Sequence, residues 1–262
     1  MTGPLGVIGG GAFLEAGPLA GTALQKIVTG RGVVRVHVGD DFVFLRRHGE
    51  DGYHPPHAIP HHAHVLALES LGVKRVAGFA SSGALHADVR PGDLLVPDDY
   101  ISWHDPPSFA ANEYLHIVPS LDEGVRDLLL RSAEWAMGSR DRGAAVRGAS
   151  GASGGAAAPG SVLHREGVYV ETRGPRFETA AEVRMLAAHG SVVGMTAASE
   201  ATLCQERGLG YAMICTVDNW ANGLDVEQLT LERFQAQLAR SSVVAQKILG
   251  QLLRLWREGA RG

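Results

Sequence analysis

GPRFET at residues 174–179 and GMTAASE at residues 194–200 are the stretches of this chain that say most about its fold and its chemistry. The first combines a proline-fixed turn, a guanidinium, an aromatic ring and, in Thr179, a hydroxyl that opens a helix. Such a set suits a small anionic or sugar-containing ligand better than it suits a plain hydrophobic core. The two stretches therefore predict a ligand site.

The bulk composition excludes several classes of protein. A chain of 262 residues with 45% hydrophobic and 20% charged residues buries a large core as one sizeable domain. Its net charge of −4 argues against a nucleic-acid partner. Cys204 and Cys215 form no CxxC pair, so neither a disulfide framework nor a thiolate zinc site is expected. Without a secretory signal or an apolar run of roughly 20 residues, the chain is expected to be cytoplasmic and to have no membrane partner.

Short runs rich in valine, isoleucine and leucine alternate with helical patterns, which predicts an α/β architecture. We expect strands at residues 5–8, 33–38, 42–45, 73–79, 93–97, 167–172, 192–194 and 211–217. Helices are expected at residues 62–71, 121–137, 179–188, 197–206 and 229–256. Residues 139–160 contain almost no large apolar side chain, and we interpret them as a mobile surface loop.

Three further stretches offer ligands for an anion. Gly9-Gly10-Gly11 follows a predicted strand, where glycines let backbone N–H groups approach a phosphate. Arg47 and His48 end another strand, and Ser81-Ser82-Gly83 follows a third. Taken alone, each is more often a tight loop, a solvated strand end or a polar turn.

The motifs GPRFET and GMT-x-x-x-E resemble those of the purine nucleoside phosphorylase and methylthioadenosine phosphorylase family. The resemblance covers nearly the whole chain and implies one nucleoside phosphorylase-like domain over residues 1–262, with a central mixed β-sheet flanked by helices. It assigns phosphate contacts to the following residues: Gly10, Gly11, Arg47, His48, Ser81 and Thr196. Gly11 and Ala80 depart from the family pattern, since each replaces a residue whose side chain binds phosphate there. Ser81 and Ser82 are candidates to compensate for that loss.

The resemblance also assigns the nucleoside side of the site. Phe177 would stack on the base, worth roughly 1–3 kcal/mol for such a contact, although a single phenylalanine is more often a core residue. Met195 would contact the ribose, and His61 is a candidate for the ribose side. His116 corresponds to a family histidine that reaches the 5′ end of the nucleoside in a neighbouring subunit, so an oligomer is implied.

A cluster of histidines precedes the helix expected at residues 62–71: His54, His57, His61, His62 and His64. Imidazoles at short spacing can bind zinc or nickel. However, no cysteine or closely spaced carboxylate completes a metal site, and a proline interrupts the run. We interpret the cluster as the start of a family helix enriched in histidine, and we expect no metal.

TVDNWANG at residues 216–223 decides the chemistry, because it follows a strand whose carboxyl end would face the ligand. Cleaving an N-glycosidic bond leaves electron density on the purine, which Asp218 or Asn219 would stabilise through a hydrogen bond or a proton. Asn219 aligns with the base-contacting residue of the family, and an amide favours a 6-oxopurine. If Asp218 contacts the base instead, the chain would be a methylthioadenosine phosphorylase.

The resemblance therefore implies phosphorolysis of a purine nucleoside, with or without a 5′-methylthio group. Inorganic phosphate is the co-substrate, no other cofactor is implied, and the expected assembly is a homotrimer or a hexamer built from two trimers. Two alternatives stay open. In the first, the chain is a nucleoside hydrolase on the same scaffold, because Gly11 and Ala80 remove phosphate ligands and water takes the place of phosphate. In the second, it is a non-catalytic protein that binds a nucleoside or a metal.

Overall fold

The computed structural model describes residues 3–13, 20–111, 114–138, 160–224 and 231–260. Their strands join in one mixed sheet, in the order β2-β3-β4-β1-β5-β10-β9-β7, with β11 on β5, β6 on β11 and β8 on β6. The strands are β1 (Leu5–Gly9), β2 (Ala23–Thr29), β3 (Gly32–Val38), β4 (Phe42–Arg46), β5 (Arg75–Ala84), β6 (Leu94–Leu95), β7 (Asp99–Ser102), β8 (Leu163–His164), β9 (Val168–Glu171), β10 (Val192–Gly194) and β11 (Gly210–Trp220).

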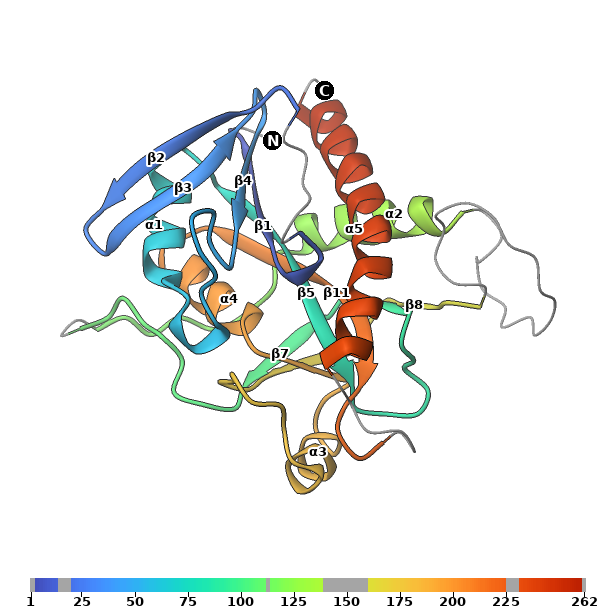
Figure 1. Ribbon diagram of the computed structural model, residues 1–262. Coiled ribbons are helices and arrows are strands. Elements are labelled where there is room, and N and C mark those ends of the chain that lie inside the picture. The colour runs from blue at the N-terminus through green and yellow to red at the C-terminus, as the bar shows by residue number, and fades with distance from the viewer. Residues whose placement is uncertain (1–2, 14–19, 112–113, 139–159, 225–230, 261–262) are drawn as a thin grey trace.

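Helices cover both faces of this sheet (Figure 1). They are α1 (His61–Ser70), α2 (Glu123–Met137), α3 (Ala180–Leu186), α4 (Ala197–Glu206) and α5 (Leu231–Ala260), with short 3-10 turns at Gly11–Phe13 and Pro56–Ala58. One buried cluster joins α1 and α4 to the sheet, and a second joins α2 and α5 to it. The α/β expectation is confirmed: one central mixed sheet lies between helices.

Alternation along the strands decides which side chains face which helices. In β11, Met213 and Cys215 pack in the cluster with α1 and α4, while Ala212 and Ile214 pack in the cluster with α2 and α5. In β5, Ala77 and Phe79 also face α2 and α5. The same alternation places Ser81 of β5 and Asp218 of β11 on the face of the sheet that α5 covers.

Strand β5 changes neighbours along its length, and this opens the sheet at one point. Its first half pairs in parallel with β1, which ends opposite Phe79. Its last residues pair with the antiparallel strand β10, whose Val193 lies opposite Gly83. Residues 80–82 therefore lie where the carboxyl ends of β1 and β10 face each other. A change of partner of this kind is where α/β sheets place ligands.

The predicted elements match the observed ones with a few differences. The predicted strand at residues 211–217 extends to Trp220, with a register shift between Val217 and Asn219. Strands β2, β7 and β8 were not predicted. Strand β2 exposes nearly every residue, so it shows no alternation, and β8 has only two residues. The loop predicted at residues 139–160 lies outside the described residues, apart from Gly160.

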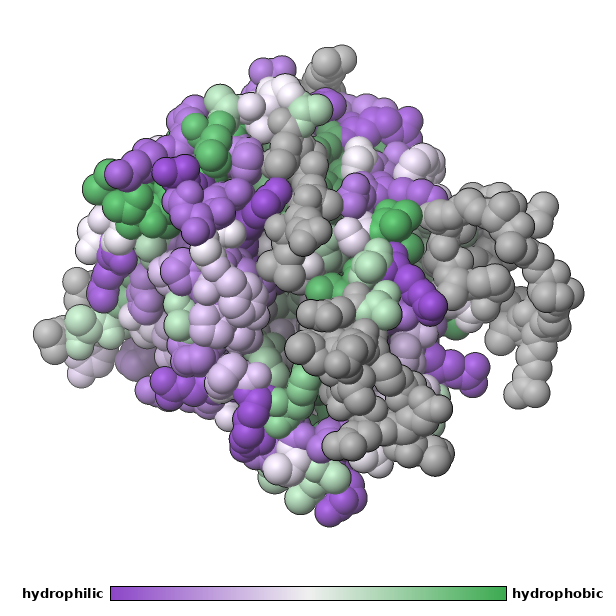
Figure 2. All heavy atoms as spheres, in the orientation of Figure 1, coloured by the Kyte–Doolittle hydropathy of each residue, from purple (hydrophilic) through white to green (hydrophobic). Residues whose placement is uncertain are grey.

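On the face that Figure 2 shows, apolar side chains gather over the β2–β3 hairpin. Leu24, Val28 and Val33 are 48%, 75% and 53% exposed there. In the described residues, no helix has both the length and the apolar character that crossing a membrane requires.

Candidate active site

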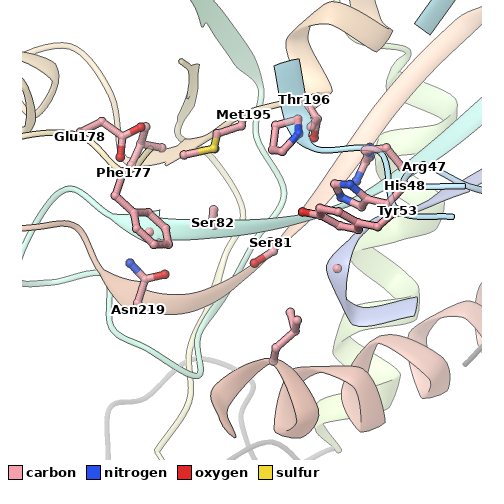
Figure 3. Close-up of a pocket in the computed structure, with 16 residues that line it drawn as sticks. Arg47, His48, Tyr53, Ser81, Ser82, Phe177, Glu178, Met195, Thr196 and Asn219 are labelled. Carbon is pink, nitrogen blue, oxygen red and sulfur yellow. The ribbon is translucent and has the colours of Figure 1, made fainter. Parts of the chain in front are cut away.

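A pocket opens where β5 changes neighbours. Segments that follow β1, β4, β9 and β10 converge on it, together with β5, β11 and α5. Its lining is Gly11, Arg47, His48, Tyr53, Pro56, Ser81, Ser82, Gly83, Phe177, Glu178, Val193, Gly194, Met195, Thr196, Asn219 and Leu238. Figure 3 shows Arg47, His48 and Thr196 at one end and Phe177, Glu178 and Asn219 at the other, with Ser81 between them.

Arg47 is held by a buried network at the inner end of the pocket. Its Nε and Nη2 donate to the two carboxylate oxygens of Glu200 over 2.6 and 2.9 Å, and its Nη1 donates to the carbonyl of Phe79 over 2.7 Å. The hydroxyl of Tyr211 donates to the same carboxylate over 2.8 Å. Burial alone lowers the pKa of Arg47, but the charge and hydrogen bonds of Glu200 outweigh it and raise this pKa. The guanidinium is therefore a permanent, oriented positive charge.

Gly10 makes room for this guanidinium, which explains the glycine turn after β1. A Cβ at position 10 would lie 2.2 Å from Arg47 Nη1 and 2.5 Å from the carbonyl oxygen of Phe79. Any side chain there would displace Arg47 from its bonds.

We predict that Gly10→Ala weakens phosphate binding by about tenfold or more and lowers the free energy of unfolding by roughly 1–3 kcal/mol. The matched control is Gly30→Ala, because a Cβ at position 30 meets nothing within 4 Å. The KM for phosphate and urea unfolding curves of both variants measure the effect. Equal behaviour of the two variants would show that Gly10 does not secure the Arg47 position.

His48 is a neutral imidazole with a defined tautomer. Its Nδ1 lies 2.8 Å from the carbonyl oxygen of His54, so Nδ1 must be the donor. Tyr53 stacks on the ring with centroids 5.1 Å apart. Burial is the main cause that lowers the His48 pKa to about 4, so near pH 7 the Nε2 atom carries no proton. His48 therefore presents an acceptor until a ligand brings it a proton.

Thr196 begins α4, yet its hydroxyl does not cap that helix. The buried carboxylate of Glu171 takes over the capping, since its Oε2 accepts from the backbone N–H groups of Ala198 and Ser199 over 2.6 and 3.0 Å. His104 Nε2 lies 2.9 Å from the other oxygen of Glu171. The hydroxyl of Thr196 is thus left for the pocket.

Leu238 of α5 packs over Gly11, the position where the resemblance led us to expect a phosphate-binding hydroxyl. A Cβ at position 11 would lie 3.0 Å from Leu238 Cδ1 and 3.6 Å from Ser81 Cβ. The side chain of Ser81 therefore lies next to the space that a side chain at position 11 would occupy. The structure brings Ser81 into the pocket, whereas Ala80 is buried.

Asp218 and Asn219 point in different directions. Asn219 lines the pocket, and its Nδ2 donates to the carbonyl of Trp220 over 2.7 Å, which leaves its Oδ1 as the acceptor. Asp218 is buried outside the pocket lining. Its carboxylate accepts hydrogen bonds from the hydroxyls of Ser81, Thr216 and Ser241.

Two predicted nucleoside contacts lie elsewhere in the described chain. His61 was expected at the ribose side, but the structure buries it outside the pocket lining, with its Nδ1 4.0 Å from a Glu200 oxygen. It is the first residue of α1. His116 is exposed next to Tyr114 and contributes nothing to the pocket of its own chain. Among the described residues, no group of three or more histidines, cysteines or carboxylates is arranged to hold a metal ion.

A family model described as the phosphorylase superfamily matches residues 4–254. The chain belongs to this superfamily. A probable 6-oxopurine nucleoside phosphorylase of Archaeoglobus fulgidus is 33% identical, over 97% of this chain and 98% of the relative. A probable S-methyl-5′-thioinosine phosphorylase of Methanopyrus kandleri is 35% identical, over 87% of this chain and 83% of the relative. Methylthioadenosine phosphorylase from Schistosoma mansoni, solved with adenine, shares the fold with a TM-score of 0.80 at 24% identity, over 97% and 91% of the two chains.

The sequence did not point to several residues that line this pocket, among them Glu178 and Tyr53. Glu178 belongs to GPRFET and lies in the pocket, with an oxygen accepting from the hydroxyl of Thr172. A carboxylate directly after the expected stacking residue was the available signal. Tyr53 also lines the pocket and stacks on His48, but no pattern in its loop pointed to it.

Proposed function

We propose that this protein catalyses the phosphorolysis of 6-oxopurine nucleosides, with or without a 5′-methylthio group. The products are the free base and ribose 1-phosphate or 5-methylthioribose 1-phosphate, which makes the protein a pentosyltransferase. One observation carries the proposal. The same pocket is lined at one end by Arg47, which suits an oxyanion, and at the other end by Phe177 and Asn219, which suit a purine base.

The oxyanion end suits phosphate as the nucleophile. Arg47 supplies a fixed positive charge, Thr196 supplies a hydroxyl, and His48 supplies an acceptor for the proton that phosphate carries. Phosphate held there would face the anomeric carbon of a ribose that contacts Met195. Holding both reactants in one orientation lowers the barrier by making the attack effectively unimolecular.

The base end suits a 6-oxopurine. Phe177 is 42% exposed and offers its ring for stacking. The free Oδ1 of Asn219 accepts an N–H of the departing purine, which stabilises the charge that develops on it. Glu178 adds a second acceptor, and the N1 atom of a 6-oxopurine carries the hydrogen that a carboxylate needs, whereas N1 of adenine does not. The alternative in which Asp218 reads adenine has no support, because Asp218 does not line the pocket and its carboxylate accepts hydrogen bonds from the hydroxyls of Ser81, Thr216 and Ser241.

The hydrolase alternative rests on the two lost ligands at Gly11 and Ala80. Ser81 weakens that argument, because it brings a hydroxyl to the space beside Gly11. Arg47 also favours an oxyanion co-substrate, since its guanidinium lines the pocket and has five N–H donors, of which three bond Glu200 and Phe79. Phosphorolysis is therefore the better supported reaction.

The proposal includes an assembly and a location. A homotrimer, or a hexamer of two trimers, would let His116 reach the site of a neighbouring subunit. Tyr114 and Val118, which flank His116, are 99% and 84% exposed and suit burial against a second copy. No cofactor other than phosphate is proposed, and the proposed location is the cytoplasm.

A substrate panel tests this function. We expect phosphate-dependent release of hypoxanthine from inosine and 5′-methylthioinosine, and release of adenine from adenosine and methylthioadenosine at least about tenfold slower, the effect of one mismatched hydrogen bond. Liquid chromatography of the free bases, with and without phosphate, gives the rates. Faster cleavage of the adenine nucleosides would contradict the base assignment.

A further inference from the structure

We propose that Asp218 is a positioning residue that turns Ser81 into a hydrogen-bond acceptor within the anion site, so that the protein selects a protonated oxyanion, such as phosphate, over sulfate. This inference rests on the proposed function and deepens it, because it states which chemical form of the co-substrate the site recognises. Asp218 itself does not line the pocket, so it acts through Ser81.

The geometry follows from strand alternation and from α5. Ser81 follows Ala77 and Phe79 on the α5 face of β5, and Asp218 lies on the same face of β11. Ser241 of α5 reaches the same carboxylate. The register shift at the end of β11 occurs at Asp218 and lets Asn219 enter the pocket while Asp218 stays buried.

The proton count on Ser81 fixes its role. An ionised carboxylate only accepts hydrogen bonds, so the single hydroxyl hydrogen of Ser81 must point to Asp218. Toward the pocket, the Ser81 oxygen then shows only lone pairs. Burial raises the Asp218 pKa to about 6 against the lowering effect of the three hydroxyls, which leaves the group ionised above that pH.

A lone pair in an anion site discriminates by the ligand's protonation. Phosphate carries at least one hydrogen near neutral pH, and it can donate this hydrogen to Ser81. Sulfate carries none, so whichever of its oxygens lies against the Ser81 oxygen meets it lone pair to lone pair. His48 acts in the same direction, because its Nδ1–H is committed to the His54 carbonyl and its Nε2 accepts. Arg47 attracts both anions and does not discriminate between them.

The neighbouring residue Ser82 provides a matched control. It also lines the pocket, but its hydroxyl donates to the backbone carbonyl of Thr216 over 3.0 Å and is itself buried. Ser82→Ala removes a hydroxyl from the same strand without changing the acceptor that Ser81 presents. Ser241→Ala removes one hydrogen bond from Asp218 and leaves the bond between Ser81 and Asp218 in place.

The experiment compares phosphate, arsenate and sulfate in the full-length protein near pH 7.5, above the Asp218 pKa. Competition of sulfate with phosphate in the activity assay gives the ratio of the two binding affinities during turnover. Calorimetry with each ion gives the same ratio without turnover. We expect the wild type to bind sulfate at least about tenfold more weakly than phosphate, with arsenate close to phosphate because it is also protonated.

In Ser81→Ala, phosphate binding should weaken by about tenfold while sulfate binding does not weaken, so the selectivity falls to the part that His48 provides. In Asp218→Asn, the amide can donate to Ser81 and free its hydroxyl hydrogen for the pocket, so sulfate should bind more tightly than in the wild type. Ser82→Ala and Ser241→Ala should keep the wild-type ratio. If Asp218→Asn does not fold, Ser81→Ala decides alone.

Equal weakening of phosphate and sulfate in Ser81→Ala would overturn the inference, because it would make Ser81 a donor or a purely structural residue. A wild type that binds both ions equally would overturn it as well. If the wild type releases no base with phosphate, the proposed function fails, and calorimetry with the three ions still decides the selectivity.

Discussion

Replacing Arg47 by methionine is expected to abolish phosphate-dependent turnover and to lower the free energy of unfolding by about 3–5 kcal/mol. The second effect arises because Glu200 is fully buried and Arg47 is its charged partner, at 2.6 and 2.9 Å. Without the guanidinium, a carboxylate stays in the core uncompensated, or takes up a proton. Urea unfolding and the KM for phosphate measure the two effects.

The double variant Arg47→Met with Glu200→Gln separates stability from function. It removes the orphaned charge, so most of the lost stability should return, since replacing both members of a buried ion pair is often nearly neutral. Phosphate binding should not return, because no positive charge remains at the inner end of the pocket. A double variant that regains phosphate-dependent activity together with stability would contradict the role of Arg47 as a phosphate ligand.

Asn219→Ala is expected to lower kcat by about 100- to 1000-fold, the usual effect of removing one group that stabilises charge in the transition state. The fold should be little affected, because Asn219 is only half-buried and its hydrogen bond is to the adjacent Trp220 carbonyl. Steady-state kinetics with inosine, together with calorimetry for phosphate, tests this prediction. An unchanged kcat would show that the leaving base is stabilised by another residue.

Asn219→Asp serves as the companion variant, since it keeps the shape and changes the hydrogen-bonding character. An ionised carboxylate accepts from an exocyclic amino group and repels a 6-oxo group. The ratio of inosine to adenosine cleavage should therefore fall in this variant. A rise in that ratio would contradict the contact between residue 219 and the base.

The sequence predicted the order and type of most elements, because alternating apolar strands and helical patterns survive in a single chain. Helix α4 was predicted with its observed bounds, Ala197–Glu206. The strand β2 was not found, since an edge strand with almost no buried residue has no periodic signal. Strand partners could not be predicted either, and the change of neighbours along β5 is what opens the pocket.

Many residues of the candidate site could be predicted from the sequence, but their arrangement in space could be predicted only in part. Arg47, Thr196 and Asn219 come together as expected. The opposite directions of Asp218 and Asn219 depend on a register shift that local sequence does not reveal. Leu238, which fills the space over Gly11, comes from a helix more than two hundred residues away in the chain, so the sequence at Gly11 alone could not show what replaces the missing side chain.

Phosphorolysis is the central claim, and the fate of the oxygen on the anomeric carbon tests it most directly. Inosine is cleaved in water enriched in oxygen-18 with unlabelled phosphate present, and the sugar product is analysed by mass spectrometry. We expect one ribose 1-phosphate for each hypoxanthine released. The sugar should carry no oxygen-18, because the oxygen of the new C–O bond comes from unlabelled phosphate. Free ribose that carries oxygen-18, formed at the same rate without phosphate, would contradict phosphorolysis and identify water as the nucleophile.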